Sequence, residues 1–120
     1  MKPEELALYR ATARIRQARE QERLDRRRER AWEAARRAAA LLKGQFGATR
    51  VVVFGSLLRP EAFTLWSDVD LAAWGLRPED TFKAIGAVLD LDDEIEINLV
   101  DMGACRASLR AVIEREGVEV

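Results

Sequence analysis

The first third of the chain carries its apolar residues at helical spacing. From Pro3 to Lys43 neither glycine nor an internal proline interrupts a run rich in Ala, Glu, Arg, Gln and Leu, which predicts one long helix or two helices in line. Its apolar positions form two sets on either side of the charged block 25–30: Leu6, Tyr9, Ala13 and Leu24, then Trp32, Ala35, Ala39 and Leu42. We expect the second set to pack on the rest of the chain and the first to project, where a partner subunit could cover it.

Shorter apolar runs predict three strands. The first covers Arg50–Phe54 and the second Asp68–Trp74. The third, Glu94–Val100, alternates strictly at first, which predicts a half-buried strand with a polar face. We expect the apolar face of that strand to consist of Ile95, Ile97 and Leu99. The polar face is expected to consist of Glu94, Glu96 and Asn98.

Two further helices complete the expected elements. Pro78 opens a helix that runs to about Asp90, and a last helix covers Ala104–Glu116 before a short tail. The residues expected to face the core are Phe82, Ile85, Val88 and Leu89 in the first, and Leu109, Val112 and Ile113 in the second. We therefore predict an α/β (α+β) fold, a small mixed β-sheet packed by helices, with a long helix or helix pair over 1–45 and a domain over 46–120.

Composition restricts the chemistry. The 120 residues suit a single domain and include no histidine and one cysteine, Cys105, which we expect to pack rather than react. Carboxylates are therefore the only plausible acid–base and metal-binding groups. No signal peptide or membrane-spanning run is visible, and the lone cysteine suits a reducing compartment, so we expect a cytoplasmic protein without membrane contact.

Charge is distributed unevenly. Residues 1–45 hold 13 Lys and Arg against 7 Asp and Glu, whereas residues 46–120 hold 7 against 14. Acids are interleaved with the arginines at i, i+4, as in Glu22 with Arg26 and Glu33 with Arg37. This favours a solvated helix with internal salt bridges, or a partner-binding helix that could form a homo-oligomer, over a nucleic-acid-binding helix. The acidic run 90–94 is expected to be a solvated turn.

The strongest chemical signal lies between the first two strands. Gly55 and Ser56 follow the first strand, and after eleven intervening residues Asp68 and Asp70 open the second. Alternation places both carboxylates on one face of that strand, roughly 6.6 Å apart, where they can hold a divalent cation. Glycine allows close approach of a ligand to the backbone, and serine offers a hydroxyl and an amide to a phosphate. The pattern suggests metal-assisted chemistry on a nucleotide.

These residues resemble a known family signature. The segment Phe54-Gly55-Ser56, with Arg59 three residues on and then Ser67-Asp68-Val69-Asp70-Leu71, is similar to that of the minimal nucleotidyltransferases of the DNA polymerase β-like superfamily. The likeness covers about residues 46–120 and implies the nucleotidyltransferase fold. Proteins of this size in the family resemble antitoxins whose partner is a helical toxin of the HEPN class.

The resemblance implies a role for each matching residue. Gly55 and Ser56 would bind the β- and γ-phosphates of ATP or another nucleoside triphosphate, with Arg59 as an auxiliary contact. Asp68 and Asp70 would hold two Mg²⁺ ions. One ion would activate the attacking hydroxyl and the other would stabilise the pyrophosphate leaving group. The expected product is a partner protein carrying a nucleoside monophosphate, AMP, on a hydroxyl.

The sequence departs from the family at the third carboxylate. Asn98 stands at its position, and an amide oxygen can coordinate a metal but cannot act as a base. Glu96, two residues earlier on the same face, is the candidate replacement. The alternative function is a weakened nucleotide-binding antitoxin that acts by contact. Pro60 also predicts a short or altered phosphate turn, and Trp66 either stacks on a base or packs against the neighbouring helix.

Overall fold

The structure, a computed structural model, describes residues 1–120. Four strands form one mixed sheet in the order β3-β2-β1-β4, in which only the β2–β3 pair is parallel. This arrangement confirms the predicted α+β class. The helices and strands are, in chain order, α1 (Pro3–Phe46), β1 (Arg50–Phe54), β2 (Val69–Trp74), α2 (Thr81–Leu89), β3 (Ile97–Asp101), α3 (Ala107–Glu116) and β4 (Val118–Glu119).

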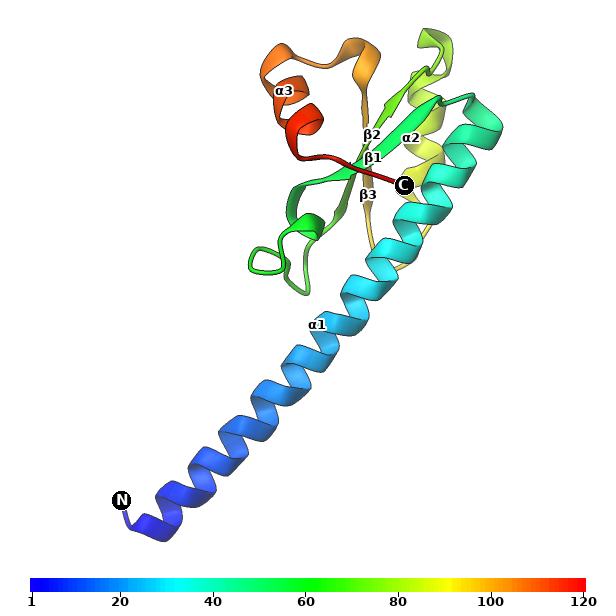
Figure 1. The fold of residues 1–120 in the computed structure, drawn as a ribbon. Coiled ribbons are helices and arrows are strands. Elements are labelled where there is room, and N and C mark those ends of the chain that lie inside the picture. Colours follow the sequence, from blue (N-terminus) through cyan, green and yellow to red (C-terminus); the bar gives the residue numbers. More distant parts are fainter.

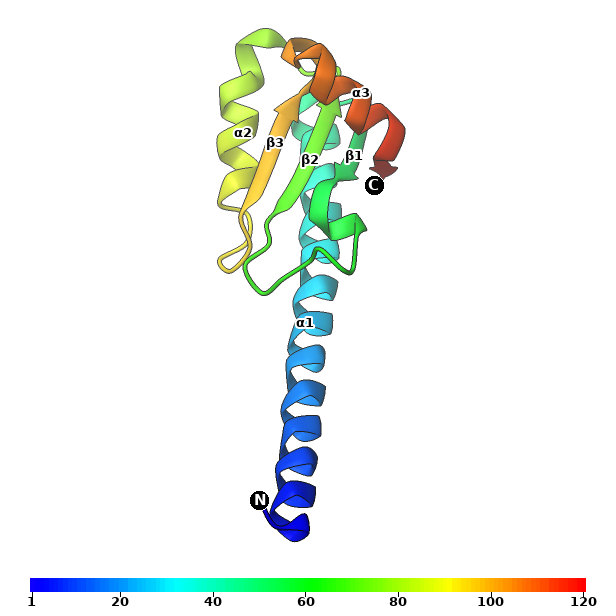
Figure 2. The same cartoon turned by 90° about the vertical axis from the view of Figure 1, so that its left-hand side faces the viewer.

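Helices cover the two faces of the sheet unequally. The main core joins α1 and α2 to one face, where alternate strand residues such as Val53, Leu71 and Ile97 are completely buried. A smaller cluster beneath α3 on the other face contains Val52, Ala72 and other buried residues. Figure 2 shows that α3 lies over only the upper part of that second face. The lower part, where β2 and β3 begin, carries no helix.

Helix α1 is a single uninterrupted helix of 44 residues. Its packed part presents small side chains, including Ala31, Ala35 and Ala38, to the sheet, so that the helix backbone approaches closely. It runs through Gly44 and stops at the second of the two glycines that border Phe46, where Gly47 adopts φ +69°, a left-handed conformation typical of a helix C-terminus.

The other half of α1 extends beyond the sheet. Figure 1 shows it leaving the sheet at the end occupied by the loops before β2 and β3, and the whole molecule measures 68 × 29 × 18 Å. Residues 1–10 are all exposed, as expected for the first apolar set, although Leu24 packs against the main core. No helix of the protein is both long and apolar enough to cross a membrane.

Several local predictions were wrong. Phe82 is 87% exposed, because α2 packs through Ala84 and Val88, whereas Phe82 was expected on the buried face. Helix α3 begins at Ala107 rather than Ala104, since Asp101 accepts the N–H of Gly103 and caps a short 3₁₀ turn there. The predicted tail forms β4, which pairs with β1.

The third strand begins later than predicted. Ile95, Ile97 and Leu99 are buried, as expected, but β3 starts at Ile97 rather than Glu94. The Asp92 carboxylate accepts the N–H groups of Glu94 and Ile95 at 2.9 and 3.0 Å, so this backbone forms a turn before it can join the sheet.

Candidate functional site

Three neighbouring strands bring two of the predicted site residues, Asp70 and Asn98, into one row with Phe54. In the antiparallel pair Phe54 lies opposite Asp70, and in the parallel pair Asp70 lies opposite Asn98. Asp70 and Ala72 are two residues apart on β2, so their side chains lie on the same face of the sheet, the one partly covered by α3. Phe54, Asp70 and Asn98 are all half-buried. Sheet register thus places Asn98 directly beside the central aspartate.

The Gly55 backbone touches this row. Gly55 has φ +82°, and a Cβ atom built on it would lie 2.6 Å from Oδ2 of Asp70. A side chain here would clash with the carboxylate and strain the backbone, so only glycine suits the position. The turn that joins β1 to the loop therefore lies directly against the carboxylate of β2.

The turn after Gly55 is short, as predicted. Residues Gly55–Leu58 form one 3₁₀ turn, Leu57 is completely buried, and the Ser56 carbonyl accepts the Arg59 N–H at 3.0 Å. Arg59 has an extended backbone, which is the conformation that the following Pro60 favours. The Arg59 side chain is exposed and forms no ion pair.

Asp68 and Glu96 lie just before their strands. The Val69 N–H donates to the Glu96 carbonyl at 2.9 Å, so the two chains run side by side from this point into the parallel pair. Glu96 is exposed and Asp68 is half-buried. Glu96 precedes Asn98 by two residues, which places its Cα on the side of Asp68 rather than of Asp70.

The charges of this row favour a cation. Burial raises the pKa of Asp70 above its usual 3.8, the Asn98 side chain opposes the rise, and the nearby charge of Asp68 adds to it. A divalent cation would compensate two carboxylates held this way. The donors are all oxygens, two from carboxylates and one from an amide, which suits Mg²⁺. No three His, Cys, Asp or Glu side chains anywhere lie close enough to hold a metal, so Glu96 does not join the aspartates in such a group.

Two arginines of α1 hold the backbone around this row. Arg27 donates to the Ser67 carbonyl at 2.9 Å and to the Glu94 carbonyl at 3.4 Å, which links the loops that precede β2 and β3. Arg28 donates to the Leu57 carbonyl at 3.1 Å and so holds the 3₁₀ turn. The three site loops are therefore tied to one rigid helix.

Sequence reasoning missed these contacts and expected salt bridges within α1 instead. The pairs Glu22–Arg26 and Glu33–Arg37 do not form, because all ion pairs of α1 run to residues 92 and 94. An arginine at the centre of a helix gives no indication in sequence that it will reach a carbonyl 40 or 67 residues away. The signal that was available is the cluster of three consecutive arginines, 26–28, on a helix that also packs on the core.

A second polar cluster centres on Asp92. Its carboxylate is buried and lies 3.2 Å from Nε of Arg30, whose Nη1 lies 3.2 Å from Glu94. Burial alone would raise the pKa of Asp92, but hydrogen bonds from the Glu94 N–H, Arg30 and the Ile95 N–H together lower it below 3.8. The prediction of a fully solvated acidic turn was therefore wrong at this residue.

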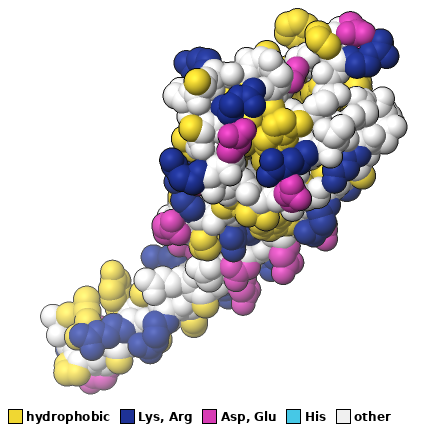
Figure 3. Space-filling view, turned by 45° about the horizontal axis from the view of Figure 1, so that its top comes forward, with side chains coloured by type: hydrophobic (Ala, Val, Ile, Leu, Met, Phe, Trp, Pro, Cys, Tyr) yellow, Lys and Arg dark blue, Asp and Glu magenta, His cyan; other side chains and the backbone are white.

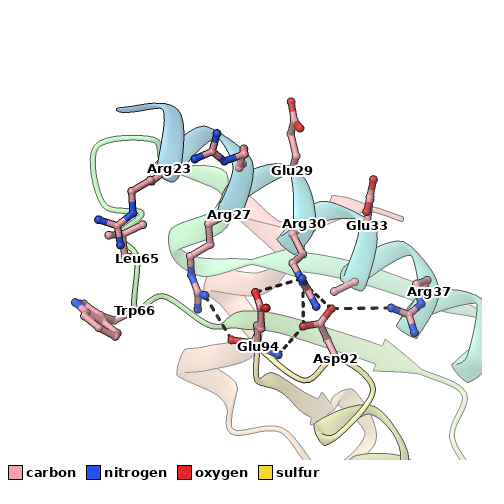
Figure 4. A pocket seen from close by; sticks show the side chains of 12 residues that line it. Arg23, Arg27, Glu29, Arg30, Glu33, Arg37, Leu65, Trp66, Asp92 and Glu94 are labelled. Atoms are coloured by element: carbon pink, nitrogen blue, oxygen red, sulfur yellow. Dashed lines mark hydrogen bonds and ion pairs between the residues drawn. The ribbon is translucent and has the colours of Figure 1, made fainter. Parts of the chain in front are cut away.

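A groove of about 790 Å³ lies over this cluster, between α1 and the loops before β2 and β3 (Figure 4). Arg23 and Trp66 lie at one end, and Arg37 lies near the other. Trp66 is 87% exposed, so the prediction that it packs against a helix was wrong. Stacking of its ring on a base stays a prediction.

Comparison with known proteins places the fold. No family model and no curated protein matches the sequence. Among solved structures, a chain in the crystal structure of a mutant of the toxin–antitoxin complex MntA-HpeT superimposes with a TM-score of 0.58. The match covers 71% of this chain and 69% of that chain at 19% sequence identity. At this identity the likeness establishes a shared fold.

Proposed function

We propose that the protein is a minimal nucleotidyltransferase that transfers a nucleoside monophosphate, AMP, from ATP–Mg²⁺ to a hydroxyl of a partner protein. One observation carries the proposal: the register of β1, β2 and β3 places the Gly55 turn on one side of Asp70 and Asn98 on the other, on an open part of the sheet. The Gly55 turn of the sequence signature and its expected third-acid position are therefore neighbours of one carboxylate, which supports the proposal.

The proposal assigns each group a task. The Gly55-Ser56 turn binds the terminal phosphates through its backbone and hydroxyl, with Arg59 as an added cation. Asp68, Asp70 and the Asn98 oxygen form the set that would hold Mg²⁺, which when bound supplies charge neutralisation for the phosphates and polarises the acceptor oxygen. Arg27 and Arg28 keep the three loops in register while these groups act.

The proposed partner follows from the fold. The shared fold with a chain of a toxin–antitoxin complex supports a role as the antitoxin of a toxin protein. We propose a HEPN-type toxin as the acceptor, in agreement with the resemblance in sequence.

The assay uses ATP labelled at the α-phosphate, Mg²⁺ and the product of the adjacent gene. We expect label to pass to that protein, and Asp70→Ala to abolish transfer while the fold is retained, because the carboxylate faces an open part of the sheet. Asp80→Ala, a partly exposed aspartate away from the row, is the matched control. No transfer by the natural protein with Mg²⁺ or Mn²⁺ would refute the catalytic function.

The second candidate function is a nucleotide-binding antitoxin with weak or no turnover. Asn98 favours it, because the amide lies beside Asp70 where the third carboxylate is expected and cannot accept a proton. The rate of transfer by Asn98→Asp distinguishes the two candidate functions. A rise in rate of about 10²-fold or more indicates that the natural protein lacks its base. An unchanged rate that Glu96→Gln then lowers shows that Glu96 acts as the base.

A further inference from the structure

The projecting part of α1, residues 3–23, which we call the arm, meets the rest of the chain only in its last turn, where Glu20 and Arg23 border the loop 63–66. None of its side chains forms an ion pair. Its side-chain hydrogen bonds run from Thr12 to the Leu8 carbonyl and from Gln21 to Asp25, both within the same helix. Most of the stability of a helix in a protein comes from packing one of its faces, so a helical segment with so few tertiary contacts is a candidate surface for a binding partner.

The arm carries an apolar stripe of the kind that pairs with another helix. Leu8, Ala11, Ile15 and Ala18 follow a 3-4-3 spacing, which places them along one side of the helix. Leu8 is 69% exposed and Ile15 is 54% exposed. In Figure 3, hydrophobic side chains and Lys or Arg side chains gather on the projecting end of the helix. Large exposed aliphatic residues in repeated spacing mark a protein-binding surface.

The stripe is bordered by one sign of charge. Between Leu6 and Arg19 there are four arginines, at positions 10, 14, 16 and 19, and no aspartate or glutamate. On a helical projection Arg10 and Arg14 lie on one side of the stripe, and Arg16 and Arg19 lie on the other. A complementary helix must therefore present carboxylates on both sides of its own apolar residues.

The C-terminal end of the arm also lies beside the loops of the candidate site. It leaves the sheet at the end where the loops before Asp68 and Glu96 lie, and Arg23 closes the groove next to Trp66 (Figures 1 and 4). A protein bound along the arm is consequently held near the Gly55–Asp70 row.

We propose that the arm docks a helix of the acceptor protein that has apolar residues at 3-4 spacing flanked by Asp and Glu. This inference rests on the proposed function, because it identifies the surface that brings the acceptor hydroxyl to the site. A second copy of the chain fits less well. Pairing two arms would bring together two segments that each carry four arginines and no acidic residue, and these positive charges would repel one another. Nucleic acid would use the arginines but leaves Leu8 and Ile15 without a role.

The experiment measures binding of the purified adjacent-gene product to the full chain by isothermal titration calorimetry. Leu8→Glu/Ile15→Glu removes the stripe, and Arg10→Glu/Arg14→Glu reverses part of the border. Phe82→Glu is the matched control, because Phe82 is also a large exposed apolar residue but lies on α2. We expect at least a 10-fold weaker affinity for each arm variant, an unchanged affinity for the control, and weaker binding of the natural protein as salt rises.

Other results overturn the inference. These are no binding by the natural protein, equal binding by the arm variants, a natural dimer in light scattering that Leu8→Glu/Ile15→Glu converts to monomer, or arm-dependent affinity for poly(U) RNA with none for the protein. Titration with Mg²⁺–ATP separates this from the proposed function. If partner binding depends on the arm but the natural protein neither binds Mg²⁺–ATP nor transfers label, the docking surface stands and the nucleotidyltransferase function fails.

Discussion

The two halves of α1 use the same residue types for different purposes. In the packed half, alanines lie against the sheet, and arginines 27, 28 and 30 reach carbonyl and carboxylate oxygens of distant loops. In the arm, the larger Leu8 and Ile15 are exposed, and the arginines have no acidic partner. Buried apolar residues, most of them alanines, together with arginines that bind distant oxygens accompany packing within the chain. Large apolar residues together with free arginines indicate a surface available for binding.

Truncation of a leucine should have the most unequal effect on stability in the two halves. Leu42→Ala removes a completely buried side chain from the packed half and should lower the free energy of unfolding by about 2–5 kcal/mol. The matched change in the arm, Leu8→Ala, should alter it by about 0.5 kcal/mol or less. Urea denaturation followed by circular dichroism measures both. Equal losses would mean that the arm contributes to the fold of the isolated chain.

Substitutions of arginines in the two halves should differ less in their effect on the free energy of unfolding. Arg27→Ala removes a charged donor from the partly buried carbonyl of Ser67 and from that of Glu94, and should lower the free energy of unfolding by about 1–3 kcal/mol. It should also slow nucleotide transfer, because both loops precede candidate site residues. Arg16→Ala in the arm should leave stability and ATP binding unchanged. If Arg27→Ala left the transfer rate intact while lowering stability, Arg27 would have only a structural role.

The smallest effect is a pH dependence confined to the packed half. The pKa of Asp92 is lower in the folded protein than its usual 3.8, so its charge stabilises the fold above that value, and this stability is lost as the pH falls through the folded pKa. Unfolding measured at successive pH values below about 4 should therefore show a steeper loss for the natural protein than for Asp92→Asn. Parallel curves would contradict the role of the Arg30–Asp92 contact.

Regular elements of this fold were predictable because their signals are local. β1 and β2 begin and end within a residue of the prediction, since β-branched or apolar runs bounded by glycine suffice to define them. β4 was missed because its two residues, Val118 and Glu119, show no periodicity and are fixed only by pairing with Val53 and Val52. Phe82 was misplaced because periodicity does not reveal that the smaller Ala84 gives a closer helix–sheet contact.

The candidate site was predictable in part for the same reason. The Gly55-Ser56 turn and the aspartates of β2 form a pattern within 16 residues, whereas the register that places Asn98 beside Asp70 was expected only from the resemblance. Arg27 and Arg28 were not foreseen because their partners are carbonyl oxygens, which every residue possesses. A contact between a side chain and the backbone of a distant segment cannot be predicted from the residue types involved.

The continuity of α1 sets a length requirement for any acceptor. The helix runs without interruption from the exposed stripe to Arg27, and at about 1.5 Å per residue Leu8 and Ala18 lie roughly 28 and 14 Å along the axis from that arginine. An acceptor anchored on the stripe must extend over this distance for its hydroxyl to arrive beside Asp70. A short peptide would carry the anchoring residues or the hydroxyl, but not both.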